Sequence, residues 1–81
     1  MMLACEAALY PLGTAHYSRI IKEALAAVPV GKVELEVGSM STVIRGEDDE
    51  VWKAVRLLFE VAAKSGDVVM VLTVSNRCGC R

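Results

Sequence analysis

Residues 32–45, which read KVELEVGSMSTVIR, decide the fold. The first six alternate between charged and aliphatic side chains, which indicates a β-strand with one polar face. Gly38-Ser39 breaks this pattern, and Met40–Arg45 forms a second predicted strand. Because the link between the two strands is so short, the sequence predicts a β-hairpin in the middle of the chain.

A helix and a further strand flank this hairpin on each side. Upstream, the alternating strand Met2–Tyr10 precedes a helix over Tyr17–Val28, whose apolar residues recur at spacings of three and four. Downstream, the acidic run Glu47–Glu50 suits the positive end of a helix dipole and opens a second helix that extends to Ala62. A final apolar strand covers Val68–Ser75.

The element order is therefore strand, helix, strand, strand, helix, strand, and no linker or repeat interrupts residues 1–81. Two strand-helix-strand units of this kind close into a split βαβ sandwich. We predict one α+β domain of the ferredoxin-like βαββαβ type, with a four-stranded antiparallel sheet and two helices on one face.

Charge and hydropathy exclude several classes of protein. The formal net charge is -1 and the charges are interspersed, so no basic face for nucleic acid is expected. The longest apolar run, Val68–Val74, is far shorter than the ~20 residues that a membrane helix needs. No signal peptide is recognised at the N-terminus, so we expect a cytoplasmic protein.

The size and composition favour a homo-oligomer. A domain of 81 residues buries only about 60% of the surface that its unfolded chain exposes. The hydrophobic fraction is 54%, and the last strand is apolar on both faces. A monomer would leave an apolar patch on the sheet face opposite the helices, so we expect a second subunit there, in a dimer or a dimer of dimers.

No catalytic arrangement is recognisable. The single histidine, His16, has no evident orienting partner, and Gly13 alone is not a phosphate loop. We therefore expect neither enzymatic activity nor a cofactor. Cys78 and Cys80 could hold a soft metal ion, but a structural zinc site needs four ligands, so two free thiols near the terminus are the simpler interpretation.

The sheet face without helices is the better candidate for a ligand site. Glu6 interrupts an otherwise apolar strand, and a buried carboxylate requires a partner. Tyr10 offers an aromatic face for a cation, and short hydroxyls can donate or accept hydrogen bonds. These hydroxyls belong to Ser41, Thr42 and Ser75. The alternative is that Glu6 pairs with Arg45 across the sheet and binds nothing.

Four segments together resemble the YkoF-like family that binds thiamine or hydroxymethylpyrimidine, and the related single-domain thiamine-binding family. The resemblance covers about Cys5 to Gly79 and rests on residues 8–12 (ALYPL), 41–46 (STVIRG), 59–69 and Ser75 with Cys78-Gly79. It implies ferredoxin-like repeats that pair into dimers, with binding and no established catalysis. One repeat is present here, so the resemblance implies a homodimer in place of a tandem pair.

The resemblance also implies a set of ligand-binding residues, with two departures. The set is Glu6, Ala8, Tyr10, Ser41, Thr42 and Ser75. The family's first strand often has a serine at Ala8 and an amide at Glu6, and its third strand often reads Thr-Thr-Cys at residues 41–43. Loss of one hydroxyl changes which ligand a hydrogen-bonding site accepts. The alternatives are an assembly domain without a small ligand and a thiol-dependent metal carrier.

Overall fold

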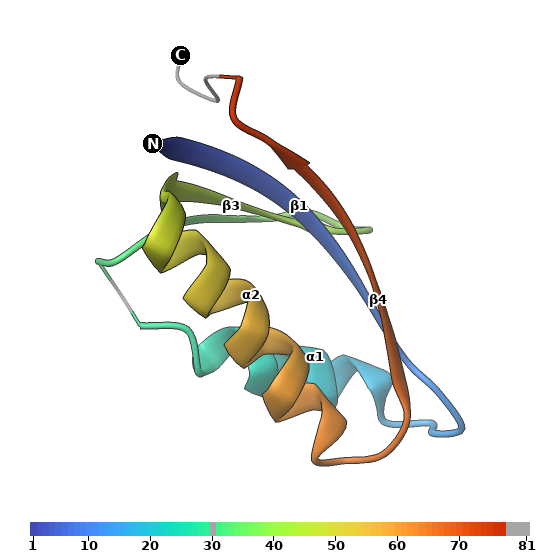
Figure 1. Ribbon diagram of the computed structural model, residues 1–81. Helices are drawn as coiled ribbons and strands as arrows, with labels where there is room; N and C mark the ends of the chain where they lie inside the picture. The colour runs from blue at the N-terminus through green and yellow to red at the C-terminus, as the bar shows by residue number, and fades with distance from the viewer. Residues whose placement is uncertain (30, 78–81) are drawn as a thin grey trace.

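Four strands form one antiparallel sheet in the order β2-β3-β1-β4. The computed structural model describes residues 1–29 and 31–77 of the chain. The elements in chain order are β1 (Met2–Pro11), α1 (Tyr17–Ala26), β2 (Glu34–Val37), β3 (Thr42–Glu47), α2 (Asp48–Ala63) and β4 (Val68–Ser75). Both helices cover the same face of the sheet (Figure 1). This confirms the predicted ferredoxin-like α+β fold.

The central strand β1 sets the register for its two neighbours. Glu6 lies opposite Val43 of β3 on one side and opposite Thr73 of β4 on the other. Ala7, one residue further, lies opposite Thr42 and Leu72. Because successive residues of a strand point to opposite faces, Glu6 and its partners face away from the helices, whereas Ala7 and its partners face toward them. We call the face that carries Glu6 the open face.

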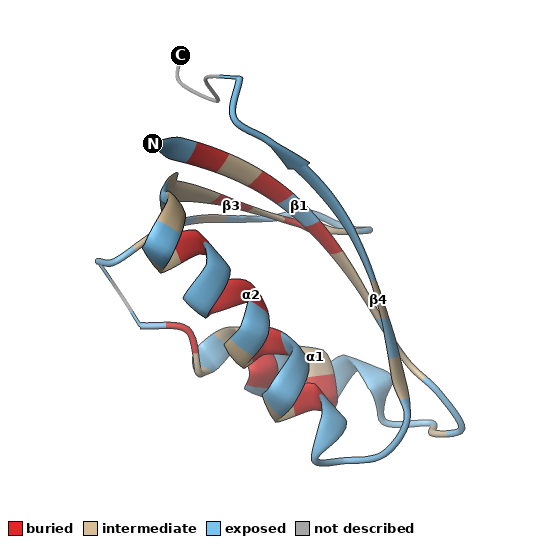
Figure 2. Ribbon diagram, in the orientation of Figure 1, coloured by how far each residue is buried: buried red, intermediate tan, exposed pale blue. Residues whose placement is uncertain are grey.

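The core lies between the helices and the inner face of β1 and β3. Its largest fully buried side chains are Ile44, Val51 and Cys5. The buried positions of α2, such as Val51 and Leu58, recur at helical spacing and point at the sheet, as the sequence pattern predicts. Figure 2 shows that burial concentrates on β1, β3 and the inner sides of the helices, whereas most of β4 is exposed.

Several boundaries differ from the sequence prediction, and β1 and β3 extend past their predicted ends to Pro11 and Glu47. Helix α1 ends at Ala26 and not at Val28, because the chain tightens into a last turn before Pro29, with the Val28 amide donating to the Leu25 carbonyl at 3.2 Å. Strand β3 begins at Thr42 and not at Met40, because the Gly38 amide donates to the Ser41 carbonyl at 2.8 Å and closes a turn. Strand β2 begins two residues later than predicted, at Glu34.

Candidate functional site

The start of β3 brings two of the predicted ligand residues into direct contact. The Ser41 hydroxyl donates to Oε2 of Glu6 at 3.0 Å. Glu6 is exposed on the open face, and Ser41 is half-buried at the end of the β2–β3 turn. A carboxylate oriented by one hydroxyl keeps further acceptor capacity toward solvent, so it can still receive a donor or a positive charge.

The alternative pairing of Glu6 with Arg45 is wrong. Nη1 of Arg45 lies 3.3 Å from Oε1 of Glu34 and 3.1 Å from Oε1 of Glu36, both on β2. The register explains this choice, because Glu34 lies directly opposite Arg45, whereas Ala4 occupies the opposing position on β1. The β2 carboxylates therefore hold the guanidinium.

The other predicted residues of the open face are spread along β1 and β4. Ala8 lies opposite Val71, and Tyr10, about half exposed, lies opposite Val69. Tyr10 is four residues from Glu6, which is roughly 13 Å along a strand. Ser75 lies opposite Ala4, and its hydroxyl accepts a hydrogen bond from the backbone amide of Arg77 at 2.9 Å. The open face thus carries these residues as a strip and not as one compact cluster.

Thr42 does not join that strip. It points to the helix side of the sheet and is only 6% exposed. The expectation that Ser41 and Thr42 would lie together with Glu6 is wrong for Thr42, since neighbouring residues on a strand alternate between faces. Within residues 1–29 and 31–77, the Thr42 hydroxyl has no hydrogen-bond partner.

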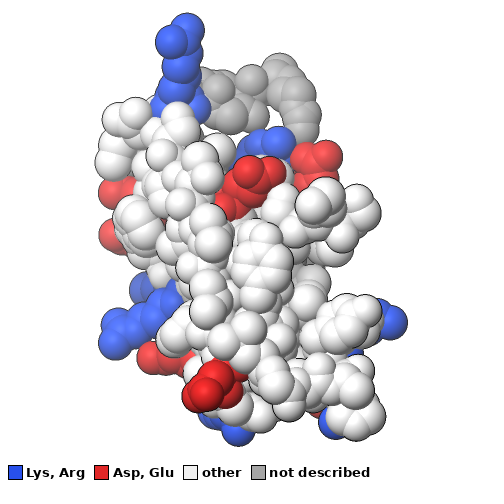
Figure 3. Space-filling view, turned by 90° about the vertical axis from the view of Figure 1, so that its right-hand side faces the viewer, with Lys and Arg blue, Asp and Glu red and all other residues white. Residues whose placement is uncertain are grey.

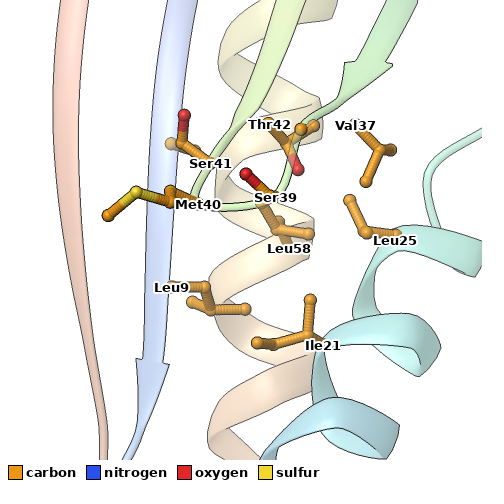
Figure 4. A pocket seen from close by; sticks show the side chains of 11 residues that line it. Leu9, Ile21, Leu25, Val37, Ser39, Met40, Ser41, Thr42 and Leu58 are labelled. Atoms are coloured by element: carbon orange, nitrogen blue, oxygen red, sulfur yellow. The ribbon is translucent and has the colours of Figure 1, made fainter.

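The Thr42 side chain lines a pocket of about 100 Å³ between the β2–β3 turn and the helices. Its walls are mainly aliphatic, from Leu9, Ile21, Leu25 and Leu58. Figure 4 shows the Thr42 oxygen pointing toward the space between Leu25 and Leu58. Ser39 and Met40 of the turn complete the rim. A hydroxyl without a protein partner, set among mainly aliphatic walls, is suited to a flat ligand with one polar edge.

Sequence reasoning missed Ser39, Met40 and the aliphatic walls of this pocket. Ser39 lies in a Gly-Ser turn signal, which predicts a loop whether or not a ligand binds there. The aliphatic residues belong to ordinary strand and helix patterns. Only the three-dimensional arrangement of the turn, α1 and α2 shows that the space between them is not filled.

A second hollow, of about 300 Å³, lies between α2 and the segment around Lys32. Its charged rim is engaged internally: Nε of Arg56 lies 3.4 Å from Oε2 of Glu60, and Nζ of Lys53 lies 3.9 Å from Oε2 of Glu50. No polar group comparable to the Thr42 hydroxyl is buried there. We therefore regard the pocket at Thr42 as the candidate site.

The remaining chemistry of the described residues is sparse. No group of three or more His, Cys, Asp or Glu side chains that could hold a metal ion is found in residues 1–29 and 31–77. Cys78 and Cys80, the predicted metal-binding alternative, lie outside those residues. Cys5 is buried, and burial, together with the negative charge of Glu6, raises the pKa of its thiol. This thiol is therefore protonated at neutral pH and is not an activated nucleophile.

No helix in the described part of the chain is both long and apolar enough to cross a membrane.

Comparison with known proteins extends the likeness over nearly the whole chain. The model of the YKOF-related family matches residues 2–81. No curated protein sequence matches this chain.

Solved structures share the fold. A hypothetical protein of Methanocaldococcus jannaschii is 26% identical, with a TM-score of 0.84 over 99% of this chain and 84% of that one. A Streptococcus pneumoniae protein is 22% identical, with a TM-score of 0.84 over 93% of this chain and 86% of its own. A candidate thiamine biosynthesis/salvage protein of Thermotoga maritima is 18% identical, with a TM-score of 0.80 over 95% and 85% of the two chains.

Proposed function

This chain belongs to the YKOF-related family, and from that premise we propose that it binds thiamine or its hydroxymethylpyrimidine moiety without catalysing a reaction. The Thermotoga maritima protein of the same fold, with its assignment to thiamine biosynthesis or salvage, supports this choice of ligand. The observation that carries the proposal is the unpartnered Thr42 hydroxyl, with Ser39 and Ser41 nearby, in a pocket whose walls are mainly aliphatic.

The pocket suits the aminopyrimidine ring. A hydroxyl can donate to a ring nitrogen or accept from the exocyclic amine, and the aliphatic walls can contact both faces of a flat ring. An enclosed apolar cavity of 150 Å³ accommodates benzene, so a pocket of about 100 Å³ must widen to admit a substituted ring. The exposed turn residues Ser39 and Met40 are the segment that we expect to move.

The open face offers complementary groups for the cationic part of thiamine. The Glu6 carboxylate, held by Ser41, can balance the positive thiazolium, and the exposed Tyr10 ring can stack against it. Ala8 and Ser75 belong to the same face and remain part of the proposed contact set. Ser41 connects the two areas, since its hydroxyl faces Glu6 while the residue also lines the pocket.

A domain that only assembles with copies of itself is the second candidate, and the exposed apolar residues of β4 favour it. Ligand-dependent stabilisation separates the two candidates. A ligand that binds only the folded state stabilises by about 2.7 kcal/mol at a hundredfold excess over its dissociation constant. In a domain of this size, that raises the unfolding midpoint by about 10–20 °C.

The experiment is thermal unfolding with and without thiamine or hydroxymethylpyrimidine, with choline as the unrelated cation. We expect Thr42→Val to abolish most of the shift from both ligands, and Glu6→Gln to reduce mainly the shift from thiamine. Thr73→Val, which makes the same change on the open face, is the matched control. The absence of any rise in the unfolding midpoint at millimolar ligand would overturn the proposal. If only Glu6→Gln and Thr73→Val lose the ligand-induced rise, the ligand binds on the open face and not in the pocket.

A further inference from the structure

Charge is distributed unevenly around the proposed ligand site. None of the residues that line the pocket at Thr42 is charged, and its polar side chains are the hydroxyls of Ser39, Ser41 and Thr42. The ionised group in contact with this lining is the carboxylate of Glu6, whose Oε2 accepts a hydrogen bond from the Ser41 hydroxyl at 3.0 Å. The site therefore combines neutral hydroxyls with one negative charge.

The basic residue of β3 on the open face is engaged elsewhere. Arg45 lies four residues beyond Ser41, which is roughly 13 Å along a strand. Its Nη1 lies 3.3 Å from Oε1 of Glu34 and 3.1 Å from Oε1 of Glu36, and only 20% of its side chain is exposed. Turning this guanidinium toward a ligand would break charge-assisted hydrogen bonds that it already makes. Arg45 is therefore poorly placed to neutralise a bound anion.

The surrounding surface adds little positive charge. Figure 3 views the molecule from the side on which β4 lies; among the described residues, a wide uncharged area occupies the centre, and the visible basic side chains lie toward its margins or beside acidic ones. A phosphate group that leaves water needs positive partners, because an unpaired buried charge is costly. Neutral hydroxyls can donate hydrogen bonds to a phosphate, but they do not neutralise it.

The orientation of the ligand follows from the two halves of the proposed site. With the pyrimidine ring in the pocket and the thiazolium beside Glu6, the methylene group that joins the rings passes Ser41, which borders both areas. Hydroxymethylpyrimidine carries its hydroxyl on that same methylene carbon. A phosphate on this hydroxyl would lie next to the Glu6 carboxylate, whereas a phosphate on the hydroxyethyl arm of thiamine would lie further away, beyond the thiazolium.

We propose that the site selects ligands without a phosphate group, and that the Glu6 carboxylate rejects their phosphate esters by charge repulsion. This inference rests on the proposed function and adds the chemical form in which the ligand is bound. Repulsion between like charges increases as their separation decreases. The phosphate ester of hydroxymethylpyrimidine is therefore rejected more strongly than thiamine monophosphate, in which the positive ring also offsets part of the charge.

Isothermal titration calorimetry of the full chain at low salt tests this proposal with thiamine, thiamine monophosphate, hydroxymethylpyrimidine and the phosphate ester of hydroxymethylpyrimidine. We expect each ester to bind about tenfold or more weakly than its parent compound, with the larger ratio for the pyrimidine pair. Glu6→Gln keeps the size of the side chain and one acceptor oxygen but removes the charge, so both ratios should fall. Glu60→Gln makes the same change on the outer face of α2 and is the matched control, with both ratios unchanged.

Weaker binding of both esters, together with smaller ratios in Glu6→Gln, supports the proposal. Esters that bind as tightly as their parent compounds would overturn it and leave the proposed function intact. Ratios that persist in Glu6→Gln would show that Glu6 is not the group that rejects phosphate, which also overturns the proposal. Failure of all four compounds to bind would instead contradict the proposed function itself.

Discussion

The Thr42 hydroxyl contributes little to the stability of the ligand-free protein. The side chain is nearly buried, its neighbours in the pocket are mostly aliphatic, and no hydrogen-bond partner lies within the described residues. Because this oxygen is not among the fully buried unpartnered atoms, water can bind it in the free protein, and the hydroxyl contributes little to folding. The hydroxyl is therefore free to bind a ligand.

We expect Thr42→Val to change the free energy of unfolding of the ligand-free protein by less than about 1 kcal/mol, because valine replaces a partly solvated hydroxyl with a methyl group of similar size. Urea unfolding without ligand measures this change. Thr73→Val, on the exposed open face, should stay within about 0.5 kcal/mol of the unmodified chain. If Thr42→Val is the less stable of the two, the hydroxyl has a partner in the free protein.

Cys5 makes the free energy of unfolding depend on pH in the alkaline range. Burial, and secondarily the charge of Glu6, raises the pKa of its thiol above the ordinary value. The unfolded chain therefore releases this proton at a lower pH than the folded chain. The stability that Cys5 contributes is complete below the ordinary thiol pKa of about 8.5 and is lost as the pH rises toward the raised folded value.

The expected result is a steeper loss of stability between pH 8 and pH 10 in the unmodified chain than in Cys5→Ala. Urea unfolding of both proteins at the two pH values measures it. The comparison removes the contribution of lysine and tyrosine titration, which the two proteins share. Parallel pH dependence in both proteins would contradict the assigned shift.

Proline substitutions in strand β4 test which of its backbone amides bond to β1. Proline at an edge position whose amide points to solvent leaves the ladder intact, whereas proline at an inward position removes one of its bonds. The Leu12 amide donates to the Asp67 carbonyl at 2.9 Å, and hydrogen-bonding direction alternates along the strand, so Val71 bonds to β1 and the Leu72 amide points outward. We expect Leu72→Pro to remain folded.

The adjacent substitution, Val71→Pro, should lower the free energy of unfolding by about 1–3 kcal/mol or more, because it leaves a β1 carbonyl without its donor. Circular dichroism during urea unfolding and sedimentation distinguish the two variants. Equal destabilisation by both prolines would show that the assigned direction of the β4 amides is wrong.

The order of elements was predictable because each follows from a local pattern. Alternation along β1 and helical spacing along α2 identify these elements without knowledge of their neighbours. The end of α1 and the start of β3 were displaced by two residues, since turns close through hydrogen bonds that periodicity does not encode.

The candidate site was predictable only in part. Proximity of Glu6 and Ser41 follows from strand order, and the structure contains that contact. The face of Thr42 follows from alternation and was assigned wrongly because the hydroxyl pair was treated as one unit. The pocket depends on how the β2–β3 turn and α1 border the same space, an arrangement of distant segments that no local pattern specifies.

The molecule as a whole carries its polar and apolar surfaces on different elements. Charged pairs stabilise the β2 edge and the outer face of α2, as in Arg45 with Glu34 and Arg56 with Glu60. The β4 edge has no comparable protection, apart from Asp67 and Arg77 just beyond its ends. We expect a second copy to stabilise a small domain with this distribution, so its unfolding midpoint should rise with protein concentration, which thermal unfolding at several concentrations measures.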